Sequence, residues 1–123
     1  MYDKAYIKIL FNQIYSALIK IKERTENIHS ANDFTTKEGE EKLDSICIQF
    51  MAIGENLKKI SIYTNDEIFH KYSHIDWKGL KGFRDVLAHQ YFNIDEEQVF
   101  IIIKHELPKI IETVENILSN EFQ

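Results

Sequence analysis

Apolar residues recur at three- and four-residue intervals along most of the chain, which is the spacing of amphipathic helices. The first stretch predicts a helix from about Asp3 to about Ile28. The polar sequence HSANDFTT then predicts a loop, and Thr35 with Glu38 has the spacing of a capping box. A second long helix is therefore expected from there to near Ser61.

The second predicted helix carries a glycine within its length. Its apolar positions are Leu43, Ile46, Cys47, Phe50, Ile53, Leu57 and Ile60. Gly54 interrupts this run, and a glycine inside a helix costs about 1 kcal/mol relative to alanine. Its presence predicts that another helix or a ligand approaches closely there, with a glycine tolerated by chance as the alternative.

The third quarter of the chain has shorter patterns. Residues 65–72 predict a short helix, followed by a turn into Trp77. A third main helix should follow, with Asp76 placed to cap it. Its apolar positions are Leu80, Phe83, Leu87 and Tyr91.

The last predicted helix begins at Asn93 or Asp95 and extends almost to the chain end. Pro108 should kink it, because proline cannot donate the hydrogen bond to Lys104 and crowds that carbonyl. Four main helices with mostly short connections predict an all-α, antiparallel bundle of four to five helices. A single domain over residues 1–123 is expected.

Composition supports one helical domain. The chain has 123 residues, of which 44% are hydrophobic and 28% charged, and one proline with four glycines leaves little material for a small all-β protein. The apolar run from Val99 to Ile103 is far shorter than the ~20 residues of a membrane-spanning helix, and MYDKAYIK has no signal-peptide core. We expect a cytoplasmic protein without membrane contact. The single cysteine, Cys47, excludes a disulfide framework and predicts a buried thiol.

Charge is unevenly distributed along the chain. A net charge of −5 argues against bulk, non-specific nucleic-acid binding. Residues 69–91 nevertheless carry four cationic and two acidic side chains, so the net charge of this segment is +2 and that of the remaining residues is −7. His70 and His74 have the spacing of a helical metal pair but lack a third ligand, so no metal or cofactor is predicted.

That positive segment overlaps FRDVLAHQYF, residues 83–92, in which Arg84, His89 and Tyr91 form the pattern R-x4-H-x-Y. Arginine forks onto phosphate, histidine carries protons near neutral pH, and tyrosine stacks on bases or offers a hydroxyl. Together they suit metal-independent RNA cleavage by an attacking 2′-hydroxyl. Asp85, four residues before His89, is placed to hydrogen-bond the imidazole and favour its protonated form.

One copy of the motif is not enough for this chemistry. On a regular helix Arg84 and His89 lie about 140° apart, so they cannot line one straight face. The helix must distort, or a second surface must complete the site. A two-fold homodimer with the third helices side by side would supply two arginines and two histidines in one groove.

These residues resemble the HEPN domains, and among them the HepT-like toxins. The resemblance rests on four ordered segments: FMAIGENLKKI with Gly54 and Glu55, IDWKGLKGFRDVLAHQYF, IDEEQVF, and Leu107-Pro108. It implies a dimeric helical bundle in which Arg84 and His89 from both chains line a cleft that cleaves cellular RNA without metal. It also implies a type VII toxin-antitoxin pair, in which an MntA-like nucleotidyltransferase antitoxin neutralises the toxin and can AMPylate Tyr91.

Plainer readings exist for each of these residues. Arg84 and His89 can be a surface ion and a helix-terminal histidine, and Tyr91 can simply continue the apolar stripe. Glu55 can orient Arg84, face the cleft or form a structural ion pair. Asp85 departs from the asparagine common in HEPN nucleases and adds a carboxylate near a site meant for polyanions. The alternative function is a non-catalytic HEPN subunit that binds nucleotide or regulates a nucleotidyltransferase complex.

Overall fold

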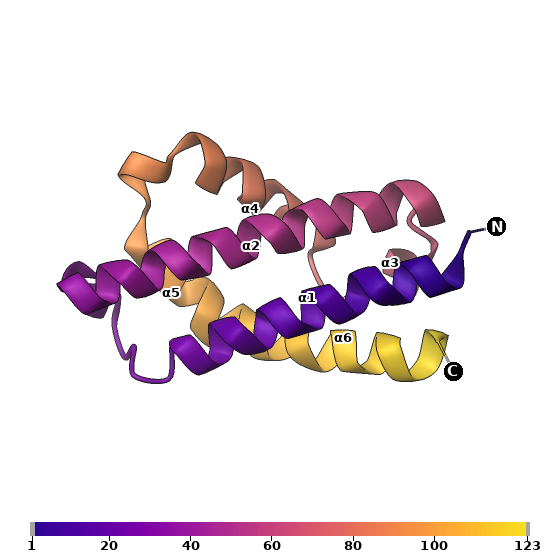
Figure 1. The fold of residues 1–123 in the computed structure, drawn as a ribbon, viewed down its shortest axis with the longest axis horizontal. Helices are drawn as coiled ribbons and strands as arrows, with labels where there is room; N and C mark the ends of the chain where they lie inside the picture. Colours follow the sequence, from indigo (N-terminus) through magenta and orange to yellow (C-terminus); the bar gives the residue numbers. More distant parts are fainter. Residues whose placement is uncertain (1, 123) are drawn as a thin grey trace.

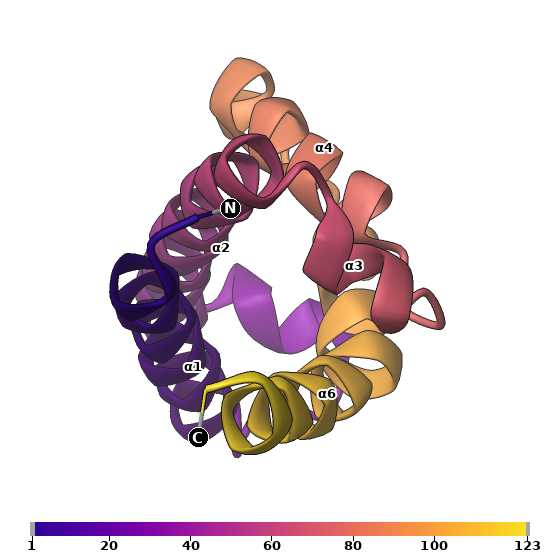
Figure 2. The same cartoon turned by 90° about the vertical axis from the view of Figure 1, so that its right-hand side faces the viewer.

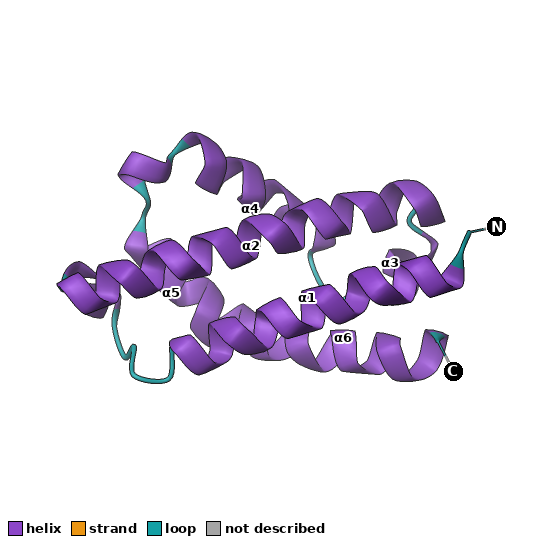
Figure 3. Cartoon of the chain, viewed as in Figure 1, coloured by secondary structure: helices purple, strands orange, loops and turns teal. Residues whose placement is uncertain are grey.

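The computed structural model describes residues 2–122, and these form a helical bundle without strands (Figure 3). The α-helices are α1 (Lys4–Arg24), α2 (Lys37–Thr64), α3 (Glu67–Lys71), α4 (Trp77–His89), α5 (Glu96–Ile101) and α6 (Leu107–Glu121). Two 3-10 turns, η1 (Ala31–Thr35) and η2 (Tyr91–Asn93), and one π-helical segment, η3 (Ile102–Glu106), lie between them. The all-α prediction is confirmed.

Long helices run lengthwise through the molecule. Figure 1 shows α1 antiparallel to α2 and to α6, with both chain termini at the same end of the bundle. Viewed along that axis in Figure 2, the helices surround a central space that their apolar side chains fill. The helix α4 packs against α2 and antiparallel to it, at the edge of the bundle away from α6.

The apolar stripes predicted for α1 and α2 are buried in this core. Phe11, Ile14 and Leu18 of α1 are fully enclosed, and every predicted apolar position of α2 is buried as well. Cys47 is among them, and burial raises the pKa of its thiol to about 11, so a structural thiol is confirmed. Within residues 2–122, no helix combines the length and apolar character that crossing a bilayer requires.

The two long helices differ from prediction at their ends. The helix α1 begins close to the predicted start, where the Asp3 carboxylate caps it by accepting a hydrogen bond from Tyr6 N. It ends at Arg24, before the predicted Ile28, and the Thr25 hydroxyl is hydrogen-bonded to carbonyls of the last turn. The predicted capping box at Thr35 is wrong by one residue. Thr36 caps α2 by accepting a hydrogen bond from Gly39 N, whereas the Thr35 hydroxyl is bonded inside η1.

The helix α2 extends to Thr64, three residues beyond the predicted end. Asn65 and Asp66 then take left-handed conformations with φ of 52° and 60°, which their short polar side chains tolerate, and α3 follows. Trp77 is buried, donates its indole N–H to the Tyr72 carbonyl at 2.9 Å, and lies against the Phe69 ring. It anchors the core.

The helix α4 begins as predicted and ends early. Asp76 Oδ1 accepts a hydrogen bond from Gly79 N at 2.9 Å, which confirms the cap. Leu80, Phe83 and Leu87 are buried. The helix ends at His89, so Tyr91 falls in η2 and is 45% exposed. Its predicted place on the apolar stripe is wrong, because the helical period stops before that residue.

The predicted last helix is divided in three. It begins at Asp95, whose carboxylate accepts hydrogen bonds from Glu97 N and Gln98 N, and Asn93 instead ends η2. Before Pro108 the chain adopts the π-helical η3, and Leu107 N donates five residues back, to Ile102 O. Pro108 has no N–H with which to continue the α-helical hydrogen bonds, and the wider π turn lies just before it. Figure 1 shows the chain changing direction between α5 and α6.

Candidate active site at the α2–α4 contact

The motif helix α4 packs closely against α2 at a glycine. A Cβ atom placed on Gly54 would lie 2.5 Å from the Cβ of Arg84. Real side chains do not come that close, so the backbone of α2 at this position must be glycine for α4 to pack here. The predicted close approach is confirmed, and the element that approaches is the one that carries Arg84.

Two carboxylates hold the Arg84 guanidinium, whose side chain is 29% exposed. Its Nε lies 2.8 Å from Glu55 Oε1 of α2, an ion pair without hydrogen-bond alignment, and this nitrogen is itself buried. Its Nη1 donates a hydrogen bond of 3.1 Å to Asp85 Oδ1. Glu55 therefore contacts Arg84, as one of the sequence hypotheses required.

Lys58 closes these contacts into a ring. Its Nζ lies 3.5 Å from Asp85 Oδ1 and 4.0 Å from Glu55 Oε1. We call Glu55, Lys58, Arg84 and Asp85 the ionic ring, which contains two cations and two anions across the α2–α4 contact. The hydrogen bond from Arg84, with a further contribution from Lys58, holds the pKa of the Asp85 carboxyl below its ordinary value. Asp85 is therefore ionised near neutral pH.

His89 is the exposed last residue of α4. Its Nδ1 lies 2.8 Å from the backbone carbonyl of Asp85, not from the carboxylate. The prediction of a carboxylate–imidazole hydrogen bond is wrong, because the Asp85 side chain is directed to Arg84 and Lys58. A carbonyl only accepts hydrogen bonds, so Nδ1 carries a proton and Nε2 is the nitrogen left for proton exchange.

Tyr91 is tied back to α2 by a residue that the sequence did not single out. Its hydroxyl donates a hydrogen bond of 2.6 Å to Asp44 Oδ1, and this bond raises the pKa of the phenol. Asp44 lies eleven positions before Glu55, so both carboxylates share one face of α2. That spacing is the signal in the sequence from which Asp44 could have been found.

The predicted site residues fall into separate groups within one protomer. Arg84 contacts both Glu55 and Asp85, and Tyr91 contacts Asp44. Across residues 2–122, no hydrogen bond or ion pair joins Arg84 to His89.

Exposed apolar side chains accompany these groups. Ile48 occupies the same face of α2 as Asp44, one helical turn further along, and is 63% exposed. Phe92 follows Tyr91 in η2 and is 95% exposed, with its ring edge-to-face against that of Tyr91. The two adjacent rings of η2 therefore present apolar area to solvent.

Other polar side chains within residues 69–91 also make structural contacts. His74 lies past the end of α3, where its Nε2 is 2.9 Å from Thr113 Oγ1, so it does not share a helical turn with His70. The Lys81 ammonium group donates a hydrogen bond to the Ser61 hydroxyl and lies over the Phe69 ring. In the described part of the chain, no three His, Cys, Asp or Glu side chains are grouped as metal ligands.

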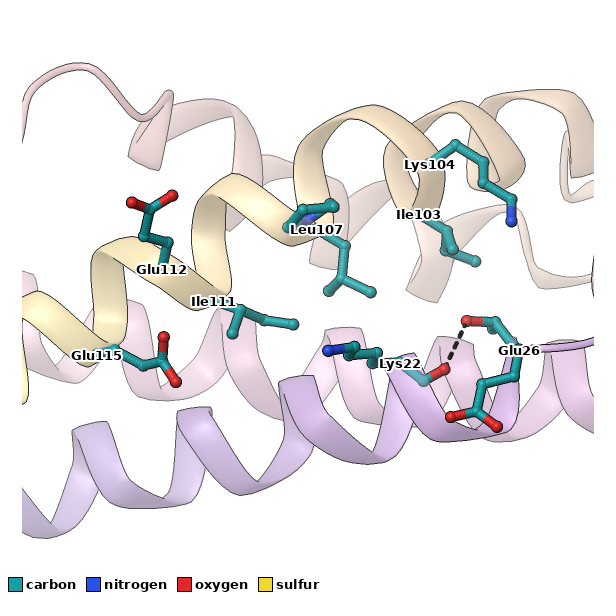
Figure 4. A pocket seen from close by; sticks show the side chains of 10 residues that line it. Lys22, Glu26, Ile103, Lys104, Leu107, Ile111, Glu112 and Glu115 are labelled. Carbon is teal, nitrogen blue, oxygen red and sulfur yellow. Dashed lines mark hydrogen bonds between the residues drawn. The ribbon is translucent and has the colours of Figure 1, made fainter.

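A separate groove of about 530 Å³ lies between the C-terminal end of α1 and the segment formed by η3 and α6. Figure 4 shows Ile103, Leu107 and Ile111 along one wall, with Lys22 of α1 facing them. None of the R-x4-H-x-Y residues lines it. The groove is therefore distinct from the candidate site.

The sequence is similar to those of a known family and of several known proteins. A family model described as Ribonuclease HepT-like matches residues 14–117. A protein of Methanocaldococcus jannaschii named "Gamma-glutamylcyclotransferase and putative RNase" is 30% identical over 113 residues, covering 92% of this chain and 48% of the relative. A "Putative RNase" of the same organism is 43% identical over 69 residues, 56% of each chain.

A third relative, a "Putative RNase" of Caldanaerobacter subterraneus subsp. tengcongensis, is 33% identical over 69 residues, covering 56% of this chain and 58% of the relative. The chain spans about half the length of these curated relatives. No solved structure matches it significantly.

Proposed function

Because this chain belongs to the HepT-like ribonuclease family, we propose that it is an endoribonuclease whose active site is completed across a two-fold homodimer. The observation that carries the proposal is the state of the motif in one protomer. Arg84 is fixed at the α2–α4 contact with one of its five N–H groups in a hydrogen bond, and His89 presents Nε2 at an exposed helix end. Each side chain has groups free for catalysis, but the two do not contact each other within one protomer.

The proposed reaction uses these groups in pairs. One His89 Nε2 takes the proton of a ribose 2′-hydroxyl, whose oxygen attacks the adjacent phosphorus. The second His89, protonated, gives its proton to the departing 5′-oxygen, so a cyclic phosphate and a free 5′-hydroxyl form. The Arg84 guanidinium stabilises the added negative charge on phosphorus. No step requires a metal ion.

The homodimer is supported by the surface around the motif. Ile48 of α2 and Tyr91 and Phe92 of η2 expose apolar area, and a second copy placed on this surface would cover these side chains. The same placement would bring two copies of η2 and of the His89 helix ends together. We propose that this surface, together with the exposed side of α4, forms the interface.

We further propose that the protein is the toxin of a type VII HepT/MntA-like pair. A nucleotidyltransferase antitoxin would transfer AMP from ATP to the hydroxyl oxygen of Tyr91, with loss of the phenol proton and release of pyrophosphate. Tyr91 is half-exposed, and its hydroxyl donates a hydrogen bond to the Asp44 carboxylate. The adduct would replace the hydrogen bond to Asp44 and add a negative charge beside a site for RNA. Inhibition then follows from repulsion and from bulk.

Expression without the antitoxin tests this proposal. The unmodified chain should arrest growth and degrade RNA, whereas Arg84→Ala and His89→Ala should restore growth. His29→Ala, in the exposed loop after α1, is the matched control and should remain toxic. Normal growth with the unmutated chain, together with a purified dimer that binds ATP and leaves RNA intact, would instead select a non-catalytic, regulatory subunit.

A further inference from the structure

The four charges of the ionic ring cancel, so the surroundings of the proposed phosphate-binding residue, Arg84, have no net positive charge. Glu55 and Asp85 balance Lys58 and Arg84, all four within 4.0 Å of a partner. A site that binds a polyanion normally presents an excess of positive charge. The ring therefore needs an explanation beyond holding α4 on α2.

The two carboxylates of the ring occupy different edges of Arg84. Glu55 lies at Nε, which is buried, so this carboxylate holds the inner edge of the guanidinium. Asp85 takes Nη1, at the terminal end of the side chain, and its own side chain is 49% exposed. The terminal N–H groups of arginine can bind either a carboxylate or a phosphate in the same geometry. The Asp85 carboxylate and an RNA phosphate therefore compete for the terminal N–H groups of Arg84.

Lys58 gives the Asp85 carboxylate a second cation. Its Nζ lies 3.5 Å from the same oxygen, Oδ1, that accepts the hydrogen bond from Arg84. Asp85 can therefore leave Arg84 and stay paired with Lys58, without becoming an isolated charge. This makes the contact between Arg84 and Asp85 replaceable at small cost.

We infer that Asp85 occupies the phosphate-binding edge of Arg84 in the free protein, and that an RNA phosphate binds by displacing this carboxylate onto Lys58. The inference rests on the proposed ribonuclease function and adds a regulatory role for Asp85 in the same site. Asp85 acts as a built-in competitor that weakens binding of single phosphates. An RNA strand that contacts several cationic side chains at once can still displace Asp85.

Nucleic-acid binding by Asp85→Asn tests the displacement. Asparagine keeps the size and an acceptor oxygen but removes the charge, so the ring becomes +1. We expect a single-stranded oligodeoxynucleotide, which has no 2′-hydroxyl and cannot be cleaved, to bind about twofold to fivefold more tightly, the range in which exposed ion pairs act. The plot of log K against log salt should steepen by about 0.7, because the ring then brings one more unit of net positive charge to the nucleic acid and releases one more counterion.

Two controls separate displacement from other causes. Glu112→Gln removes the same charge on α6, at the groove shown in Figure 4, and should change neither affinity nor slope appreciably. In an Arg84→Ala background, Asp85→Asn should give no gain. An unchanged or weaker affinity of Asp85→Asn, with the unmutated protein binding normally, overturns the displacement and leaves the ribonuclease proposal standing. Absence of binding by the unmutated protein also overturns the displacement, and the ribonuclease proposal is then decided separately by the expression test.

Discussion

Replacing Gly54 with alanine would place a methyl group where α4 touches α2. The new Cβ would lie 2.5 Å from Arg84 Cβ and 3.0 Å from its Cγ, while carbon atoms pack at about 3.5–4.0 Å. The first of these atoms is fixed to the backbone, so a rotamer change cannot relieve the overlap. The helix α4 must move outward by roughly 1 Å, and Arg84 moves with it.

Two opposing effects set the expected loss of stability. Overpacking of this kind costs about 1–3 kcal/mol, and the better helix propensity of alanine returns about 1 kcal/mol. We therefore expect Gly54→Ala to lower the free energy of unfolding by about 0–2 kcal/mol, measured by urea denaturation. Activity should suffer more, because a misplacement of about 1 Å in a catalytic group costs on the order of 100-fold in rate.

Gly82 provides the matched control on α4 itself. A Cβ at this position meets no atom within 4 Å. Gly82→Ala should therefore gain the propensity of alanine, about 1 kcal/mol, and keep its RNA cleavage. If Gly54→Ala instead behaved like Gly82→Ala, more stable and fully active, the close approach between the two helices would be refuted.

Two further predictions concern the polar contacts of the site. Tyr91→Phe removes the hydrogen bond to Asp44 and the acceptor for AMP, so the amides of η2 should exchange faster with deuterium and the antitoxin should no longer label the chain; unchanged exchange would show that this bond does not hold η2. Asp85 has a pKa lowered by Arg84, so its stabilising effect is present above the unfolded value of about 3.9 and is lost as pH falls through the folded value. The difference in urea midpoint between the unmutated chain and Asp85→Asn should thus be constant above about pH 5 and shrink below pH ~3.9, and a difference independent of pH would contradict the assignment.

The regular parts of the fold could be predicted because they follow from local rules. The spacing of apolar residues predicted the buried faces of α1 and α2, and Asp76 marked the start of α4 through its capping side chain. At α2 two adjacent threonines were equally suitable caps, and the choice of Thr36 depended on how η1 closes before it. Sequence spacing alone does not contain that information.

The polar contacts of the site depend on tertiary structure, which explains what was missed. His89 lies four residues after Asp85, and both the carbonyl and the carboxylate of Asp85 were within reach of its imidazole. The carboxylate instead contacts Arg84 and Lys58, and Lys58 reaches it only because α2 packs against α4. Tyr91 similarly pairs with Asp44, which is 47 positions away in the sequence. Gly54 was the exception, since a glycine in a helix carries a local signal of a distant contact.

The π-helical turn η3 constrains how this chain can tolerate insertions and deletions. A π turn holds one residue more than an α turn, and each residue rotates a helix by about 100°. Deleting one residue between Ile102 and Glu106 would give a continuous α-helix, but α6 would be turned about its axis relative to α5. Ile110 and Val114 would then leave the core. In this segment the number of residues should be harder to change than their identities.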